Sequence, residues 1–120
     1  MLITIKTIGY GGMKPEEFFA ELEILKPSVV VDVRENPFNA FLGAYTKPQL
    51  EKRLGHRYLW IRELGNASRS TPPVLVDEAK GLEKLRELAA AHDVVVLLCA
   101  ERDEARCHRG YIKEKLSNIV

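Results

Sequence analysis

Residues 94–99 read VVVLLC, an uninterrupted run of apolar side chains that begins with three β-branched residues. Such a run is typical of a strand that is covered on both faces of its sheet. Residues 29–33, VVVDV, repeat the pattern, with Asp32 as the one polar interruption. Two strands of this kind predict a parallel sheet with helices packed on both sides.

Weaker patterns on either side of these two runs complete the predicted element order. Residues 2–8 and 58–61 have the composition of further strands. Helical spacing and proline positions predict helices that begin at Pro15, at Thr46 as a cap, near Asp77 and at Asp103 as a cap. The order βαβαβαβα predicts a single-domain α/β three-layer sandwich over residues 1–120, with a mostly parallel four-stranded sheet and helices on both faces.

The composition is that of an ordinary folded domain. The chain has 120 residues, 46% of them apolar, and a formal net charge of +1 from 18 basic and 17 acidic side chains. A charge so near zero predicts no partner that binds through overall electrostatics. The apolar runs are too short to span a bilayer and the first residues lack a signal-peptide pattern, so we expect a cytoplasmic protein without a membrane partner. In that reducing compartment Cys99 and Cys107 are expected to be thiols, with no disulfide between them.

Polar or glycine-rich clusters follow every predicted strand, whereas the helix-to-strand connections carry no comparable cluster of chemically reactive residues. The clusters are residues 9–12, Asp32 with residues 34–37, residues 62–66 and residues 99–102. In an open parallel sheet ligands bind outside the carboxyl ends of the strands, so these clusters predict one small-ligand pocket. We expect it to centre on Cys99, Glu101, Cys107, His108 and Arg109. Asp32, Arg34, Glu101 and His108 should all lie within that one pocket of Cys99.

Three residues near the end of the fourth strand have the chemistry of a nucleophilic site. Cys99 precedes a helix N-terminus and several arginines, which would lower its pKa and favour the thiolate; the alternative is a buried cysteine that packs as a small apolar residue. His108 would exchange a proton with Cys99 or with a leaving group, or else is a core histidine bonded to a carbonyl. Glu101 is a general acid or base or, as we favour, an anchor for a neighbouring arginine.

A second group of residues is expected to bind substrate. The guanidinium groups of Arg34 and Arg109 match a phosphate or carboxylate, although each serves equally well as a brace, for example by pairing with the buried Asp32. The glycine turn after the first strand would cradle an anion or is simply a tight turn. Cys107 is a resolving thiol or a packed helix residue. The full set of substrate-binding candidates is Gly9, Tyr10, Asp32, Arg34, Pro37, Cys107 and Arg109.

Cofactor motifs are missing from the sequence. The turn at residues 9–12 lacks both the dinucleotide pattern G-x-G-x-x-G and the lysine-serine pair of a P-loop. There is no Cys-x-x-Cys knuckle, and the adjacent Cys107 and His108 point about 100° apart on a helix. We therefore expect neither a metal nor a cofactor.

Short motifs in a fixed order resemble those of a known family. They are TIGY at residues 7–10, VDVR at residues 31–34 with Pro37, ELG at residues 63–65, CAE at residues 99–101 and CHR at residues 107–109. In these motifs the chain resembles, over nearly its whole length, the bacterial and archaeal family called domain of unknown function 488. The resemblance implies an α/β fold and a cytosolic setting, and it implies no particular reaction.

The residues favour a small enzyme that uses Cys99, with His108 and arginines, on a small anionic or electrophilic substrate. A cysteine-dependent transferase or hydrolase is the expected class. A phosphatase is not expected, because the position where its loop has arginine is occupied by Ala105.

Two other classes of function remain open. A nucleic-acid binding or processing module would use the basic residues between positions 47 and 69, with Tyr45, Tyr58 and Trp60 stacking on bases. Alternatively, the same pocket would serve a non-catalytic sensor of a small ligand. The sequence leaves the oligomeric state open.

Overall fold

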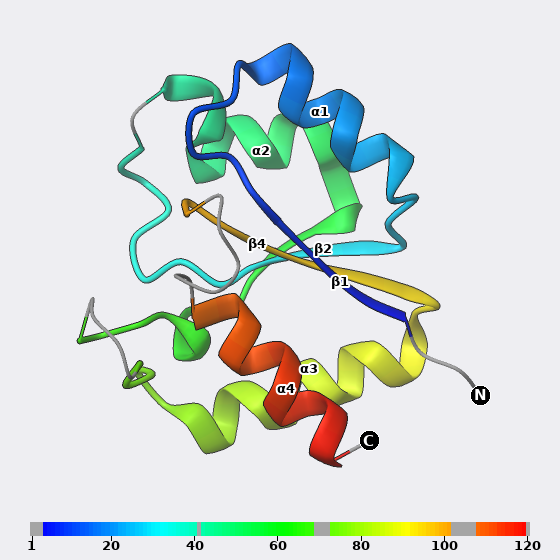
Figure 1. Ribbon diagram of the computed structural model, residues 1–120, viewed down its shortest axis with the longest axis vertical. Coiled ribbons are helices and arrows are strands. Elements are labelled where there is room, and N and C mark those ends of the chain that lie inside the picture. Colours follow the sequence, from blue (N-terminus) through cyan, green and yellow to red (C-terminus); the bar gives the residue numbers. More distant parts are fainter. Residues whose placement is uncertain (1–3, 41, 69–72, 102–107, 120) are drawn as a thin grey trace.

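A central sheet separates two layers of helices (Figure 1). The computed structural model describes residues 4–40, 42–68, 73–101 and 108–119. Within them four strands pair in the order β1-β4-β2-β3, and every pairing is parallel. The predicted α/β three-layer sandwich is therefore confirmed. The strands are β1 (Thr4–Gly9), β2 (Val29–Asp32), β3 (Tyr58–Trp60) and β4 (Val94–Cys99).

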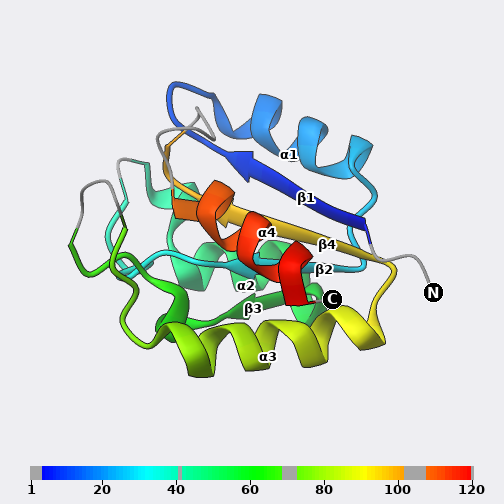
Figure 2. The same cartoon turned by 60° about the horizontal axis from the view of Figure 1, so that its bottom comes forward.

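Each face of the sheet is covered by two helices. Helices α1 (Pro15–Ile24) and α2 (Lys47–Leu54) pack on one face, and α3 (Glu78–Ala91) and α4 (His108–Ile119) pack side by side on the other (Figures 1 and 2). Alternate residues of the central strands point into the two resulting cores, with Val30, Val96 and Leu98 facing α1 and α2. Val31, Val95 and Leu97 face α3 and α4. None of the helices in the described ranges is long and apolar enough to cross a membrane.

The helix starts agree only in part with the predicted signals. Pro15 is the first residue of α1, and the carboxylate of Asp77 caps α3 by accepting a hydrogen bond from the Lys80 amide at 3.2 Å. Thr46 is the N-cap residue of α2, as predicted, but its side chain makes no capping hydrogen bond, and its hydroxyl donates back to the carbonyl of Gly43 at 2.8 Å. The predicted cap Asp103 lies outside the described residues.

The strand order creates a crevice at the carboxyl edge of the sheet. β1 and β2 are each followed by a helix on one face, whereas β4, which lies between them, is followed by α4 on the opposite face. Chain segments that leave neighbouring strands towards opposite faces open a gap between them, and ligands bind at such switch points. The fold therefore places the end of β4, and with it Cys99, in the middle of the predicted binding edge.

Candidate functional site

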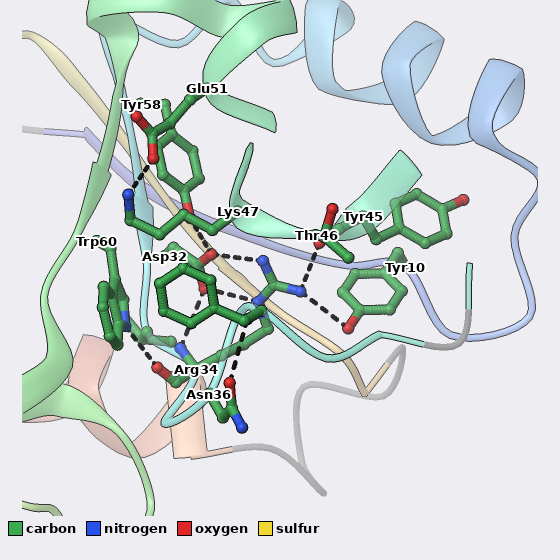
Figure 3. Close-up of polar contacts among 12 residues, drawn as sticks. Tyr10, Asp32, Arg34, Asn36, Tyr45, Thr46, Lys47, Glu51, Tyr58 and Trp60 are labelled. Atoms are coloured by element: carbon green, nitrogen blue, oxygen red, sulfur yellow. Dashed lines mark hydrogen bonds and ion pairs between the residues drawn. The ribbon is translucent and has the colours of Figure 1, made fainter. Parts of the chain in front are cut away.

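Asp32 and Arg34 form a buried ion pair where β2 ends (Figure 3). The Nε and Nη2 atoms of Arg34 donate to the two carboxylate oxygens of Asp32 at 2.8 and 2.6 Å. The Arg34 amide also donates to Oδ1 of Asp32, at 3.1 Å. Asp32 is completely buried and Arg34 is 6% exposed. The predicted pairing of Asp32 with an arginine is thus observed.

Three tyrosines enclose this ion pair. The Nη1 atom of Arg34 donates to the hydroxyl of Tyr10 at 3.1 Å and to the carbonyl of Tyr45 at 2.6 Å. The hydroxyl of Tyr58 donates to Oδ2 of Asp32. The rings of Tyr10 and Tyr45 stack with their centroids 4.3 Å apart. These contacts satisfy the buried carboxylate and guanidinium, which would otherwise carry a large desolvation penalty.

Asp32 also shifts the pKa values of two neighbouring side chains, Arg34 and Tyr58. Burial by itself would lower the pKa of Arg34, but the hydrogen bonds and negative charge of Asp32 outweigh it and raise that pKa above its ordinary value. Burial, followed by the charge of Asp32, raises the pKa of Tyr58 far above its usual range. Four of the five N–H donors of Arg34 are used by Asp32, Tyr10 and Tyr45. Arg34 is therefore a brace for this edge of the sheet more than a receptor for an anion.

Sequence reasoning missed Tyr45 and Tyr58 as members of this ion-pair network. A signal existed for Tyr58, because it pairs with Val30 in the parallel register, and residues two apart on a strand share a face. Tyr58 therefore had to face the same side as Asp32 once β2 and β3 were neighbours. Nothing comparable pointed to Tyr45, which reaches the site from the 3₁₀ turn Gly43–Tyr45.

Arg109 is the charged neighbour of Cys99. Its Nη1 atom lies 3.2 Å from Sγ of Cys99 and also donates to the carbonyl of Glu101. Cys99 and Arg109 are both 2% exposed, so this contact is inside the protein. Arg109, the residue after His108, is thus a charged partner of the sulfur, and the pairing of Cys99 with His108 stays a prediction. The anchor role expected of Glu101 is met by its backbone carbonyl.

Cys99 is disulfide-bonded in the structure, which contradicts the expectation of a reduced thiol. Cys107, the other cysteine of the sequence, lies outside the described residues, so its two alternative roles stay predictions. The expectation of reduced thiols rested only on the predicted compartment. The spacing of eight positions between Cys99 and Cys107 does not show whether the two side chains come close enough to form a disulfide.

His108 is held by the backbone at the end of β2. Its Nε2 atom lies 2.5 Å from the carbonyl oxygen of Val33 and donates to it. Burial lowers the pKa of His108, and the nearby charge of Arg109 acts in the same direction, while the bond to Val33 opposes both. The ring is therefore neutral at neutral pH. This geometry matches the alternative reading, a largely buried histidine bonded to a carbonyl.

A cavity of about 470 Å³ opens at this edge of the sheet. Of the sequence-predicted residues, it brings together Tyr10, Arg34, Cys99, Glu101 and His108. Asp32 and Arg109 are not among the lining residues. Asp32 contacts the lining residue Arg34, and Arg109 contacts the lining residue Cys99. Four further lining residues, Glu35, Asn36, Asn66 and Ala100, come from the predicted strand-end clusters, whereas Asn39 lies outside them.

Gly9 and Pro37 hold the rim together without lining the cavity. A Cβ atom on Gly9 would lie 1.8 Å from the carbonyl oxygen of Glu101, so the two chain segments meet at backbone contact. The carbonyl of Pro37 accepts a hydrogen bond of 2.7 Å from the amide of Lys47, which fixes the β2 loop to the start of α2.

The glycine turn after β1 is a tight turn. The amides of Tyr10 and Gly11 donate to the carbonyls of Cys99 and Ala100, at 3.4 and 2.8 Å. Gly12 has a φ of +73°, a conformation that favours glycine. Two of the amides that would have cradled an anion thus join the β1 and β4 loops instead, and the anion-cradle expectation is wrong for them.

The basic region between residues 47 and 69 is tied to its own surface. Lys47 pairs with Glu51, Arg57 pairs with Glu23 at 3.1 Å, and Arg53 lies over the ring of Phe19 at 4.1 Å. Arg69 lies outside the described residues. The rings of Tyr45 and Tyr58 are buried, and the indole of Trp60 donates to the Arg34 carbonyl at 2.8 Å. The two tyrosines are therefore not placed to stack on bases.

Comparison with known proteins bears on the family and not on the reaction. Neither the curated proteins nor the solved structures gave a match. The sequence model of the family described as Domain of unknown function DUF488 matches residues 14–75 and 73–116. These segments extend from the start of α1 into α4 and cover three of the four strands. The chain therefore belongs to the Domain of unknown function DUF488 family, as its motifs had indicated.

Proposed function

We propose that this protein is a small cysteine-dependent enzyme, a transferase or hydrolase, in which reduced Cys99 attacks an electrophilic substrate held in the 470 Å³ cavity. The observation that carries the proposal is the 3.2 Å contact between Nη1 of Arg109 and the disulfide sulfur of Cys99 at the wall of that cavity, because reduction of the disulfide would leave the thiol beside the same guanidinium. A guanidinium at this distance stabilises the negative charge of a thiolate, which is the nucleophilic form of cysteine.

Burial strengthens the effect of Arg109. The attraction between two charges is several times larger in a poorly solvated site than in water, and Arg109 is 2% exposed. Arg109 cannot lose its own proton near neutral pH, so the stabilising charge is permanent. A thiol beside such a group ionises more readily than a free cysteine.

The proposed step balances as follows. The thiolate of Cys99 forms a bond to an electrophilic carbon, and the leaving group departs with the electron pair of its broken bond. The exposed carboxyl group of Glu101, which lines the cavity, relays a proton from solvent to that leaving group. Water or an acceptor then displaces sulfur and gives a proton to the Glu101 carboxylate, which regenerates the thiolate. His108 forms a neutral wall of the cavity.

The charges of the described lining favour an uncharged electrophile over an anion. The charge of Arg34 is offset by Asp32, and two acidic residues, Glu35 and Glu101, line the cavity. Three asparagines supply amide groups that bind neutral polar atoms equally well as donors or acceptors. Of the two substrate classes predicted from the sequence, anionic or electrophilic, this lining supports the second.

Alkylation of reduced protein tests the proposal. In a Cys107→Ser background Cys99 is the one thiol, and its rate of reaction with iodoacetamide is measured against pH. We expect the rate to reach half its maximum well below about pH 8.5, the value for a free thiol. Arg109→Gln should raise that midpoint, Arg109→Lys should restore much of the shift, and His108→Gln should leave it nearly unchanged.

The controls separate reactivity from folding. Thermal unfolding of each variant shows whether the buried position 109 tolerates the change, and the lysine variant retains a charge if the glutamine variant does not fold. A midpoint at about pH 8.5 in both the parent and the Arg109 variants would show that Cys99 is not an activated nucleophile. The cavity would then be a binding site without thiol chemistry, and the enzyme proposal would fail.

A further inference from the structure

A second hollow lies beside the first, over the turn that follows β1. Its volume is about 760 Å³, within the range of small-molecule sites. The two hollows share three lining residues, Tyr10, Asn39 and Ala100. The others that line the second hollow are Gly11, Gly12, Met13, Lys14, Ala40, Leu42 and Tyr45.

The shared residues join the hollows through backbone contacts. The amide of Gly11 donates to the carbonyl of Ala100 at 2.8 Å, and the amide of Tyr10 faces the carbonyl of Cys99 at 3.4 Å. Ala100 follows Cys99 directly and is exposed, so it stands at the boundary between the two spaces. A ligand that reaches Cys99 in the first hollow therefore lies next to residues that also line the second.

The second hollow differs from the first in its chemistry. Its floor is built from buried apolar groups, with Met13 beside the stacked rings of Tyr10 and Tyr45. Ala40 and Leu42 add half-buried apolar side chains. Gly11 and Gly12 carry no side chains and add only backbone to the lining. Among the described lining residues only Lys14 is charged, and it is exposed.

We infer that this hollow is an apolar subsite of the Cys99 cavity, and that it takes an uncharged aromatic or aliphatic group of the same substrate molecule. The substrate class is then a small molecule with a polar, electrophilic end and an apolar arm. The inference rests on the proposed function, since it assumes that the electrophilic end meets Cys99. Continuity through the three shared residues, together with the small volume, favours an arm of one ligand over a separate partner.

A series of alkylating reagents tests the subsite. Reduced protein in the Cys107→Ser background is treated with iodoacetamide and with N-benzyl, N-phenethyl and N-(3-phenylpropyl) iodoacetamide. Each rate constant is divided by that of the same reagent with glutathione. For at least one arm length we expect the phenyl reagent to react about tenfold faster than iodoacetamide after this correction, a preference equivalent to about 1.4 kcal/mol.

Substitutions locate the preference. Ala40→Trp places a large ring in the second hollow and should abolish the preference for the phenyl reagents. Because the preference is a ratio of two rates on the same protein, a general change in the reactivity of Cys99 cancels. Ala90→Trp, at an exposed position of α3 on the other side of the sheet, is the matched control and should keep it. Ala40→Leu is the milder variant if Ala40→Trp does not fold.

The outcomes distinguish this inference from the proposed function. If every phenyl reagent has the same glutathione-corrected rate constant as iodoacetamide, the subsite is wrong while Cys99 remains a nucleophile. If the preference survives both Ala40→Trp and Ala40→Leu, the apolar group binds elsewhere and the assignment fails. If Cys99 in the reduced protein reacts with none of the reagents, it is the proposed function that fails.

Discussion

Asp32 and Arg34, two residues apart in the chain, face each other through side-chain hydrogen bonds of 2.8 and 2.6 Å inside the protein. The pair stands where β2 leaves the sheet, and its charges cancel there. Through Tyr10 and Tyr45 it also holds the β1 turn and the segment before α2 (Figure 3). One ion pair therefore fixes three of the chain segments that surround the cavity.

Asp32→Asn should be strongly destabilising. The change leaves the buried guanidinium of Arg34 without its counter-charge, which costs about 3–5 kcal/mol in comparable buried pairs. Tyr58→Phe removes only the hydroxyl that donates to Asp32 and should cost about 1–3 kcal/mol. Urea denaturation of both variants gives the free energies of unfolding. Equal losses in the two variants would contradict a dominant role for the ion pair.

Tyr58 should couple stability to alkaline pH. Its pKa is raised in the folded state by burial and by Asp32, whereas in the unfolded chain it is about 10. Above about pH 10 the unfolded state therefore binds fewer protons than the folded state, and stability falls as pH rises. The near-ultraviolet absorbance of tyrosinate should show Tyr58 ionising only on alkaline unfolding, together with the buried Tyr45, whose pKa burial also raises. In Tyr58→Phe the late phase should lose the amplitude of one tyrosinate; an unchanged amplitude would mean that Tyr58 does not contribute to it.

His108 should couple stability to acid pH in the opposite direction. Burial holds its pKa below the unfolded value of about 6.5, so below that pH the unfolded state binds more protons. Its contribution is complete above about pH 6.5 and is lost as pH falls through the folded pKa, at no more than about 1.4 kcal/mol per pH unit. His108→Gln keeps an N–H donor for Val33 and should flatten this part of the urea-derived stability profile. An unchanged slope would mean that His108 is not the group being titrated.

Gly9→Ala should be destabilising and should disturb the site. The added Cβ would lie 1.8 Å from the carbonyl oxygen of Glu101 and 2.9 Å from Nη1 of Arg109, so backbone must move. We expect a loss of about 1–3 kcal/mol, as in other overpacked positions, together with slower alkylation of Cys99. Gly43→Ala is the control, because no atom lies within 4 Å of its added Cβ, and it should stay within about 0.5 kcal/mol of the parent. Calorimetric unfolding and iodoacetamide rates measure both effects.

Local pattern was enough to predict most of the fold. The run at residues 94–99 has the bounds of β4, because a wholly apolar segment that begins with three β-branched residues favours a strand covered on both faces. Pro15 and Asp77 marked two helix starts through their backbone chemistry. Thr46 marked the start of α2 in position, but its hydroxyl is oriented by its bond to the Gly43 carbonyl in the preceding turn and accepts no hydrogen bond from the helix.

The site was predicted in position and only partly in its contacts. Strand-end clustering placed Cys99 and Arg34 at one cavity, because all parallel strands end at the same edge. Which groups touch depends on strand order and on side-chain reach, and a single sequence contains neither. Thus Arg109, one residue after the favoured His108, reaches the sulfur, and Tyr58 reaches Asp32 only because β3 lies next to β2.

The strand order has a consequence for the time at which the protein can assemble. Of the four described strands β4 is synthesised after the other three, yet it sits between β1 and β2, so that residue 4 pairs with residue 94. In a nascent chain that ends before β4, β1 has no strand to pair with and β2 has one unpaired edge. Contacts between residues so distant in sequence form slowly. Insertion of β4 is therefore the step that closes the sheet. Because Cys99 is its final residue, the proposed nucleophile takes its place in the same event that completes the sheet.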